Sequence, residues 1–175
     1  MTRSNCSAGY WTPPGQESNP SAWRRRIPIA VLALVGCATS TYLALYQYGV
    51  LTDVWDPIFG SGSEAVLTST LSTALPVPDG AIGAAAYLVE AVLELAGGRR
   101  RWADRSLLVL TLGLVAAGLG VAGLVLVIAQ PLLTGTFCSL CLASAVISIA
   151  VLVLVRSEIS AAWTHVRQHG NNRPI

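Results

Sequence analysis

Residues 106–155 decide the fold, and they read SLLVLTLGLVAAGLGVAGLVLVIAQPLLTGTFCSLCLASAVISIAVLVLV. The stretch contains no charged residue. At a rise of ~1.5 Å per residue it is much longer than one crossing of a bilayer core about 30 Å thick. Residues 130–136, QPLLTGT, carry the Pro and Gly that interrupt helices. We therefore expect two membrane-spanning helices, over residues 106–128 and 137–155, joined by a short turn.

Two shorter apolar runs lie upstream of this stretch. Residues 27–51 carry no charge and follow the arginine triplet at residues 24–26, which is typical of an uncleaved first membrane span. Residues 81–96 form a second run, which contains Glu90 and Glu94. The expected fold class is therefore an all-α membrane protein, a bundle of four transmembrane helices.

Composition and charge distribution agree with this fold class. Of 175 residues, 53% are hydrophobic and 11% are charged, against roughly 25% charged in soluble domains. A soluble globular domain is thereby excluded, and a net charge of +2 does not favour nucleic acid as a partner. All 11 basic residues are arginines outside residues 27–98 and 106–155. The positive-inside rule then places both termini in the cytoplasm and residues 52–80 and 130–137 outside.

The expected organisation is one membrane domain between two cytoplasmic tails. Residues 1–26 are expected to be a flexible tail, residues 27–156 the membrane domain, and residues 157–175 a second tail. Trp163 and Arg167 favour an interfacial helix over residues 157–169 or, alternatively, a tail that lies on the surface. His165 and His169 are four residues apart, but no other metal ligands accompany them, and no metal is expected there.

The acidic pair in the second span has two interpretations. Glu90 and Glu94 share one helix face, and acidic side chains within a bilayer favour a proton path or a partner site. In the alternative interpretation, both lie in the cytoplasmic half of the span and reach toward the arginines at residues 99–101.

The outer loop, residues 52–80, is longer than a connector needs. Ser61 and Glu64 have the spacing of a capping box, and apolar residues then recur with helical spacing. The pattern predicts a short amphipathic helix over residues 63–74 that lies on the bundle mouth or in the outer leaflet. A surface-seated loop without a ligand is the alternative.

The cysteines differ in their surroundings. Cys138 and Cys141 form a C-x-x-C at the outward-facing start of the last span, where residues three apart on a helix can form a disulfide with modest distortion. The helix N-terminus also stabilises a thiolate at Cys138. We weigh a redox dithiol against incidental cysteines and a soft-metal site, which would need further ligands. Cys6 lies in the cytoplasmic tail, and Cys37 is interpreted as an apolar filler in mid-membrane.

Three segments carry a family resemblance. Residues 56–69 (DPIFGSGSEAVLTS), residues 77–83 (VPDGAIG) followed by Tyr87, and residues 137–141 (FCSLC) resemble the vitamin K epoxide reductase family, most closely its short bacterial members. The resemblance implies a four-helix bundle that holds a quinone beside the C-x-x-C, beneath a cap formed by the outer loop. It also implies a multi-pass protein of the bacterial cell membrane that passes electrons from thiols to a quinone.

The resemblance also assigns roles to single residues. Cys141 matches the cysteine that reacts with the quinone, and Cys138 the one that exchanges with an incoming thiol. Ser69 matches a loop Ser or Thr, and Asp79 matches a side chain that hydrogen-bonds a quinone carbonyl. The implied acceptor is a quinone of the ubiquinone or menaquinone type. The implied electron donor is a thioredoxin-like or other extracytoplasmic thiol protein.

The sequence departs from the family in the outer loop and in the last span. The family usually has a second cysteine pair that relays electrons to the C-x-x-C, but Ser63 stands at the second of these positions and no cysteine lies near Trp55. Ala145 replaces a tyrosine one turn after Cys141. Electrons must then reach Cys138 directly from an external dithiol or a separate subunit. A non-catalytic member that binds a partner or quinone is the alternative function.

Overall fold

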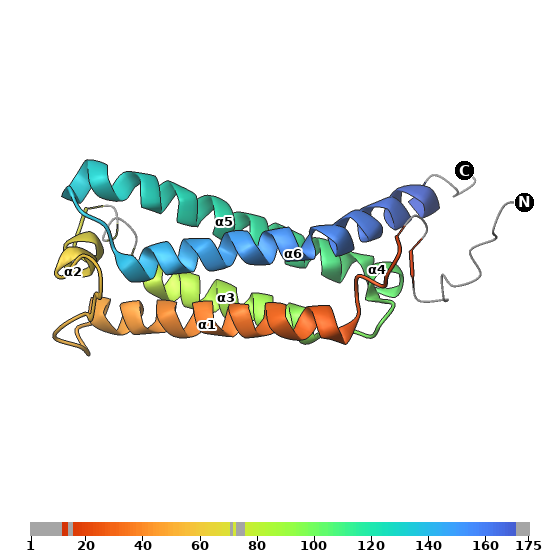
Figure 1. Ribbon diagram of the computed structural model, residues 1–175, viewed down its shortest axis with the longest axis horizontal. Helices are drawn as coiled ribbons and strands as arrows, with labels where there is room; N and C mark the ends of the chain where they lie inside the picture. Colours follow the sequence, from red (N-terminus) through yellow and green to blue (C-terminus); the bar gives the residue numbers. More distant parts are fainter. Residues whose placement is uncertain (1–11, 14–15, 71, 73–75, 171–175) are drawn as a thin grey trace, which may run out of the picture.

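The computed structural model describes residues 12–13, 16–70, 72 and 76–170, and within them it contains helices but no strand (Figure 1). The helices in chain order are α1 (Trp23–Gln47), α2 (Gly62–Leu67), α3 (Asp79–Leu95), α4 (Arg101–Asp104), α5 (Ser106–Thr134) and α6 (Ser139–Gly170).

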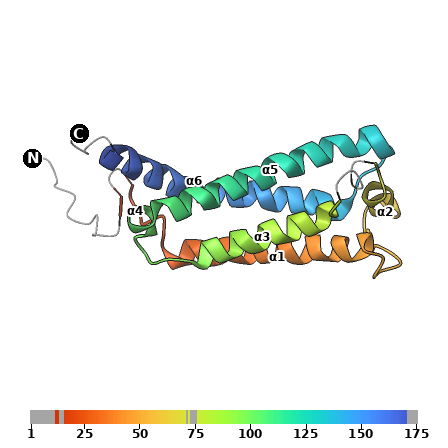
Figure 2. The same cartoon turned by 180° about the vertical axis from the view of Figure 1, so that it is seen from behind.

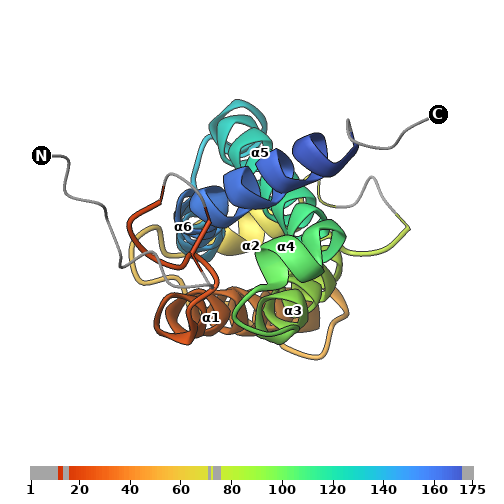
Figure 3. The same cartoon turned by 90° about the vertical axis from the view of Figure 1, so that its right-hand side faces the viewer.

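Four of these helices form an elongated bundle. α1 packs along α3, α5 packs along α6, and further contacts join α1 to α6 and α3 to α5. Figures 1 and 2 show these four helices running lengthwise, with α2 at one end and α4 at the other. Seen along the bundle in Figure 3, α1 and α3 lie on one side and α5 and α6 on the other. The start of α6, near α2, and helix α4 therefore lie at opposite ends of the bundle.

The bundle carries an apolar exterior. Among the described residues, the helices long and apolar enough to cross a membrane are α1, α5 and α6. Large side chains on α5 face outward, with Leu107 76% exposed and Leu132 79% exposed. Such surfaces are favourable in lipid and unfavourable in water. The protein is therefore an all-helical membrane protein with three evident spans.

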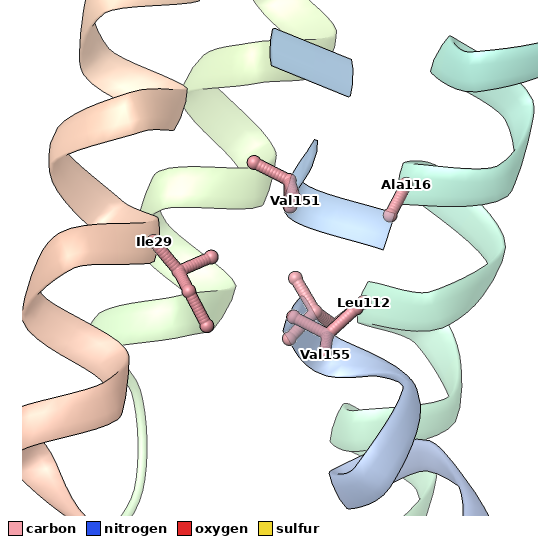
Figure 4. Close-up of a cluster of buried hydrophobic side chains, with 5 residues drawn as sticks. All are labelled: Ile29, Leu112, Ala116, Val151 and Val155. Carbon is pink, nitrogen blue, oxygen red and sulfur yellow. The ribbon is translucent and has the colours of Figure 1, made fainter. Parts of the chain in front are cut away.

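The interior of the bundle is filled by small and branched side chains. Ile29 of α1, Leu112 and Ala116 of α5, and Val151 and Val155 of α6 form one buried cluster (Figure 4). These residues come from three helices, so their burial holds the two sides of the bundle together.

α5 is longer than the sequence predicts. The prediction ended the helix at residue 128 because of Pro131, but the helix continues to Thr134 and ends at Gly135, which has φ of 69°. Proline has no backbone N–H, so Pro131 removes one hydrogen bond from the helix. The loss of this single bond does not terminate α5. Gly135 adopts the left-handed conformation of a helix C-terminus, and its N–H bonds the Pro131 carbonyl at 3.2 Å. Glycine, not proline, terminates α5.

α6 also extends past its predicted end at residue 155. It is continuous to Gly170, so residues 157–168 are helical, as the interfacial-helix prediction expected, but they continue α6 and do not form a separate helix. Glu158, Ala161 and Ala162 are buried, and the His165 ring lies edge-on to Trp102 of α4 at 5.7 Å. Packing against α4 extends the helix beyond the span that hydropathy alone defines.

The described part of the N-terminal tail is attached to the bundle. α1 begins at Trp23 rather than residue 27, and Gln16 Nε2 donates to the Ser157 carbonyl at 3.0 Å. Ser21 donates to the buried Glu158 carboxylate. Residues of the predicted tail between 16 and 22 are therefore in contact with the bundle, while Cys6 lies outside the described residues.

The outer-loop helix is shorter than predicted. α2 covers Gly62–Leu67, residues 68–70 form turns, and residues 71 and 73–75 lie outside the described residues. Ser61 makes no side-chain capping bond. Instead, Glu64 Oε1 accepts a hydrogen bond from the Val54 backbone N–H at 3.2 Å. The acidic partner of the predicted capping box thus joins two parts of the loop.

A buried charge cluster closes the opposite end of the bundle. Arg101 Nη2 lies 2.9 Å from Glu94 Oε2, Arg101 Nε lies 2.6 Å from Glu158 Oε1, and all three side chains are almost completely buried. Arg26 and Arg101 also donate to backbone carbonyls at the end of α3, including Ala96 at 2.8 and 3.2 Å. Carbonyls at a helix C-terminus lack hydrogen-bond donors within the helix. These two arginines supply the missing donors.

The two acidic residues of α3 differ in their partners. Glu94 pairs with Arg101, as one of the two interpretations expected, but it does so in the interior and not at the surface. Both carboxyl oxygens of Glu90 are buried and have no hydrogen-bond partner among the described residues.

Candidate functional site

The C-x-x-C cysteines lie at the start of α6. Cys138 and Cys141 form a disulfide with a Cα–Cα distance of 5.2 Å. The Cys141 backbone N–H donates to Cys138 Sγ at 3.1 Å. The chain turns into α6 immediately after Gly135, and this places the pair at the bundle end that carries α2 (Figure 1). The two cysteines are therefore within bonding reach of each other, as their spacing predicted.

Cys138 is covered by the outer loop. Its side chain is completely buried, and Ser63 Oγ of α2 lies 3.2 Å from Cys138 Sγ. Ser63 is the residue that stands at the position of a relay cysteine. It is thus in direct contact with the disulfide, but its hydroxyl cannot exchange disulfides.

Asp56 anchors this loop to the start of α6. Its carboxylate accepts hydrogen bonds from Ser63 Oγ at 2.6 Å, from the Ser139 backbone N–H at 3.2 Å and from the Ser139 hydroxyl. It also accepts the backbone N–H groups of Ile58 and Phe59 at 3.1 and 2.9 Å. Partial burial disfavours the charged form, but these hydrogen bonds outweigh burial and hold the pKa of Asp56 well below its usual range.

Sequence reasoning did not identify Asp56 as a site residue. The available signal was Asp-Pro, because an Asp side chain often accepts the N–H groups two and three residues further on. Of the N-terminal amides of α6, the Ser139 N–H donates to Asp56 and the Cys141 N–H donates to Cys138 Sγ.

We expect Asp56→Asn to expose Cys138. The substitution removes the charge that holds five hydrogen-bond donors, and hydrogen bonds to a charged group contribute about 1.5–3 kcal/mol each. After reduction, Cys138 in the variant should react with a maleimide roughly tenfold faster or more, measured at the Cys138 peptide by mass spectrometry. Because the pKa of Asp56 is depressed in the folded protein, its carboxylate is ionised at neutral pH and stabilises the closed loop there. This stabilisation declines progressively as the pH falls from about 4 toward the depressed pKa of the folded protein, so only strong acid should mimic the variant.

Asp53→Asn is the matched control for this experiment. Asp53 lies in the same loop, and its carboxylate accepts an exposed hydrogen bond from Thr52. An equal increase in Cys138 reactivity in both variants would contradict the anchoring role of Asp56.

A cavity of about 140 Å³ lies inside the bundle beside Cys141. Its wall is mostly apolar, and it is lined by residues of α1, α3, α5 and α6, among them Leu43, Asp79, Tyr87, Leu126, Cys141, Ser144 and Ala145. A smaller pocket of about 20 Å³ shares Asp79, Leu126 and Cys141 with it and adds Ser69 and Gln130. An apolar cavity with a few convergent polar groups is typical of a site for a small organic molecule.

The four residues predicted for the site come together in the structure. Ser69, Asp79 and Cys141 line the smaller pocket, and Cys138 is bonded to Cys141. Asp79 Oδ1 accepts hydrogen bonds from Ser72 Oγ at 2.8 Å, from the Gly80 N–H at 3.0 Å and from Gln47. Asp79 therefore acts as an acceptor at the start of α3.

Two polar groups were not predicted, Gln130 in the smaller pocket and Ser144 in the cavity wall. Gln130 Nε2 and Ser144 Oγ are buried and have no hydrogen-bond partner among the described residues. Both residues lie in apolar stretches of the sequence, where a single Gln or Ser does not indicate a binding site. Tyr87 donates to the Ser144 carbonyl at 2.6 Å, and its ring packs so closely on Gly36 that an added Cβ there would lie 2.6 Å from Tyr87 Cε1. The α1–α3 contact thus fixes one wall of the cavity.

A soft-metal site was the alternative for the cysteine pair. In the part of the chain that the structure describes, no group of three or more His, Cys, Asp or Glu side chains could hold a metal ion.

The fold and the site define an all-helical membrane protein with a disulfide-forming cysteine pair beside an internal apolar cavity. The profile of the vitamin K epoxide reductase family matches residues 27–156, and the chain belongs to this family. Membership indicates an oxidoreductase of the thiol and quinone type. A comparison with curated proteins gave no match.

Proposed function

We propose that this protein is a membrane thiol:quinone oxidoreductase in which Cys138 and Cys141 carry the electrons. The observation that carries the proposal is that one end of the disulfide, Cys141, lines the apolar cavity of the bundle while the other end, Cys138, lies under the outer loop. The cavity fits a quinone ring because its wall is mostly apolar and holds only a few polar groups. Ubiquinone and menaquinone types are both compatible with this chemistry.

The two cysteines have different tasks in this proposal. A thiolate of an external dithiol attacks Cys138 Sγ, and Cys141 leaves as a thiolate. The second thiol of the donor resolves the mixed disulfide, which leaves Cys138 and Cys141 reduced and the donor oxidised. Re-formation of the Cys138–Cys141 disulfide then passes two electrons and two protons to the quinone, which becomes a quinol.

The donor is a thioredoxin-like or other extracytoplasmic thiol protein. Because Ser63 occupies the place of a relay cysteine, this donor must reach Cys138 directly. Cys138 is completely buried, so the loop held by Asp56 has to move during each exchange. Ser69 and Asp79 are proposed to bind the quinone from the smaller pocket, with Asp79 in its protonated form, because only that form donates to a carbonyl oxygen.

The proposed topology has four crossings, with α3 as the fourth. α3 has 17 residues, about 26 Å at ~1.5 Å per residue, which is close to the thickness of the hydrocarbon core. Glu94 is neutralised by Arg101 inside the bundle, which supports a span despite its acidic residues. The arginine distribution supports cytoplasmic termini, with residues 27–156 as the membrane domain between tails 1–26 and 157–175. Placement among short bacterial family members, in a bacterial cell membrane, belongs to the same proposal.

Thiol trapping in intact membranes tests the proposal. We expect the Cys138–Cys141 disulfide to be reduced by an added dithiol and to be restored when a quinone is supplied, as read from the mass added by a thiol-blocking reagent. Membranes stripped of quinone are the control, in which the pair should stay reduced. Cysteines that remain in one state whatever is added would contradict turnover.

A non-catalytic family member is the second candidate. It is favoured by the burial of Cys138 and by Ser63, whose hydroxyl cannot relay electrons. In that case the disulfide stabilises the bundle end, and the protein binds a partner or a quinone without turnover.

A further inference from the structure

The side chain of Gln130 has a fixed orientation near the end of α5. It is only 4% exposed, and its Oε1 accepts the backbone N–H of Cys138 at 3.1 Å. A side-chain amide has one acceptor end and one donor end. Because the backbone N–H can bond only to the oxygen, the NH₂ group of Gln130 must point away from the Cys138 backbone.

This NH₂ group is a buried donor without an acceptor. Gln130 Nε2 has no hydrogen-bond partner among the described residues, and Gln130 lines the small pocket together with Cys141, Asp79 and Ser69. Buried donors in folded proteins are nearly always satisfied, and an exception calls for an explanation. The small pocket shares Asp79, Leu126 and Cys141 with the larger apolar cavity, so the two lie next to each other.

In the described part of the chain, no protein acceptor lies within hydrogen-bond reach of Gln130 Nε2. Asp79 Oδ1, which lines the same pocket, already accepts from three donors. An apolar ring with carbonyl oxygens satisfies the amide and the apolar cavity wall together. We propose that Gln130 Nε2 donates a hydrogen bond to one carbonyl oxygen of the quinone, while Gln130 Oε1 holds the Cys138 backbone. The inference rests on the proposed function, because it assumes that the ligand of the cavity is a quinone.

The hydrogen bond would assist the reduction as well as the binding. When the Cys138 and Cys141 thiols form a disulfide, two electrons and two protons pass to the quinone, and negative charge develops on its carbonyl oxygens. A fixed N–H donor stabilises that charge. Gln130 keeps its own protons throughout, so it binds and orients the acceptor without entering the electron balance.

Infrared spectroscopy of the bound quinone tests the inference without turnover. The full-length protein, with its disulfide intact, is loaded with a short-chain naphthoquinone or benzoquinone labelled with ¹³C at the carbonyls. In the wild type we expect one carbonyl band at lower frequency than in an apolar solvent. In Gln130→Leu this lowered band should be lost, and the dissociation constant for the quinone should rise about tenfold, as expected for one hydrogen bond.

Gln130→Glu separates the donor from the structural role of the side chain. At alkaline pH its carboxylate still accepts the Cys138 N–H but presents an oxygen, not an N–H, to the pocket. We expect it to lose the lowered band. The buried charge should lower the unfolding temperature, so helical circular dichroism at the temperature of the experiment verifies that the variant is folded. Ser144→Ala, which removes an unpaired donor of the cavity wall, should keep the band.

The outcomes distinguish this inference from the proposed function. A lowered band that persists in both Gln130 variants, that disappears only in Ser144→Ala, or that is absent from the wild type with either quinone would overturn the role of Gln130. Quinone turnover in those cases would leave the proposed function intact. Conversely, loss of the band in both Gln130 variants supports the inference even if the wild type shows no thiol-dependent turnover.

Discussion

Cys141→Ala is expected to reduce thiol-dependent quinone reduction to the background rate. Cys141 is the only one of the two cysteines that lines the cavity, so without it electrons cannot pass from the pair to the quinone. Cys138→Ala should abolish turnover equally, because no sulfur then lies beneath the outer loop for the donor to attack. Both rates are measured as quinol formation in membranes with a chemical dithiol as donor.

Trapping distinguishes the tasks of the two cysteines. In Cys141→Ala, the Cys138 thiolate should form a stable mixed disulfide with an added low-molecular-weight disulfide, which releases one thiol of the reagent, because no second cysteine of the pair is present to displace the adduct. In Cys138→Ala, the inward-facing Cys141 should form little of this adduct. Cys37→Ala is the matched control, since Cys37 lies in α1 and its thiol donates to the Ala84 carbonyl at 3.4 Å. Unchanged turnover in either C-x-x-C variant would contradict the redox function.

Arg101→Met is expected to destabilise the bundle more than other single changes at the end that carries α4. Arg101 is buried between Glu94 and Glu158 and donates to carbonyls at the end of α3. Removing one partner of a buried ion pair typically costs about 3–5 kcal/mol, because the remaining charge is left uncompensated. The measurement is the free energy of unfolding in detergent micelles, followed by helical circular dichroism.

A neighbouring arginine provides the control. Arg100 Nε lies 3.8 Å from Asp104 in a partly exposed pair, and such pairs contribute under about 1 kcal/mol. Arg100→Met should therefore have a small effect. Adding Glu158→Gln to Arg101→Met should recover part of the lost stability, because it removes one of the two uncompensated carboxylates. Equal effects of the two arginine variants would contradict the structural role of the buried cluster.

Most of the helical framework could be predicted from the sequence. Hydropathy located α1, α5 and α6, because each of these apolar runs is long enough to be recognised alone, and it located α3 from a shorter run that contains Glu90 and Glu94. The predicted ends of the helices were less accurate. α5 continues past Pro131 to the left-handed Gly135, and α6 continues to Gly170, where it packs against α4.

The sequence by itself determined the membrane class and the position of the cysteine pair, since both depend on local runs and on a spacing of three residues. Only the tertiary structure decided what surrounds the pair. Asp56 reaches Ser139 across 83 residues, and Ser63 reaches Cys138 across 75. Gln130 and Ser144 became buried unpaired donors only when the helices packed. Hydrogen bonds between distant segments depend on how the loop and the helices meet, and no local pattern in the chain records that geometry.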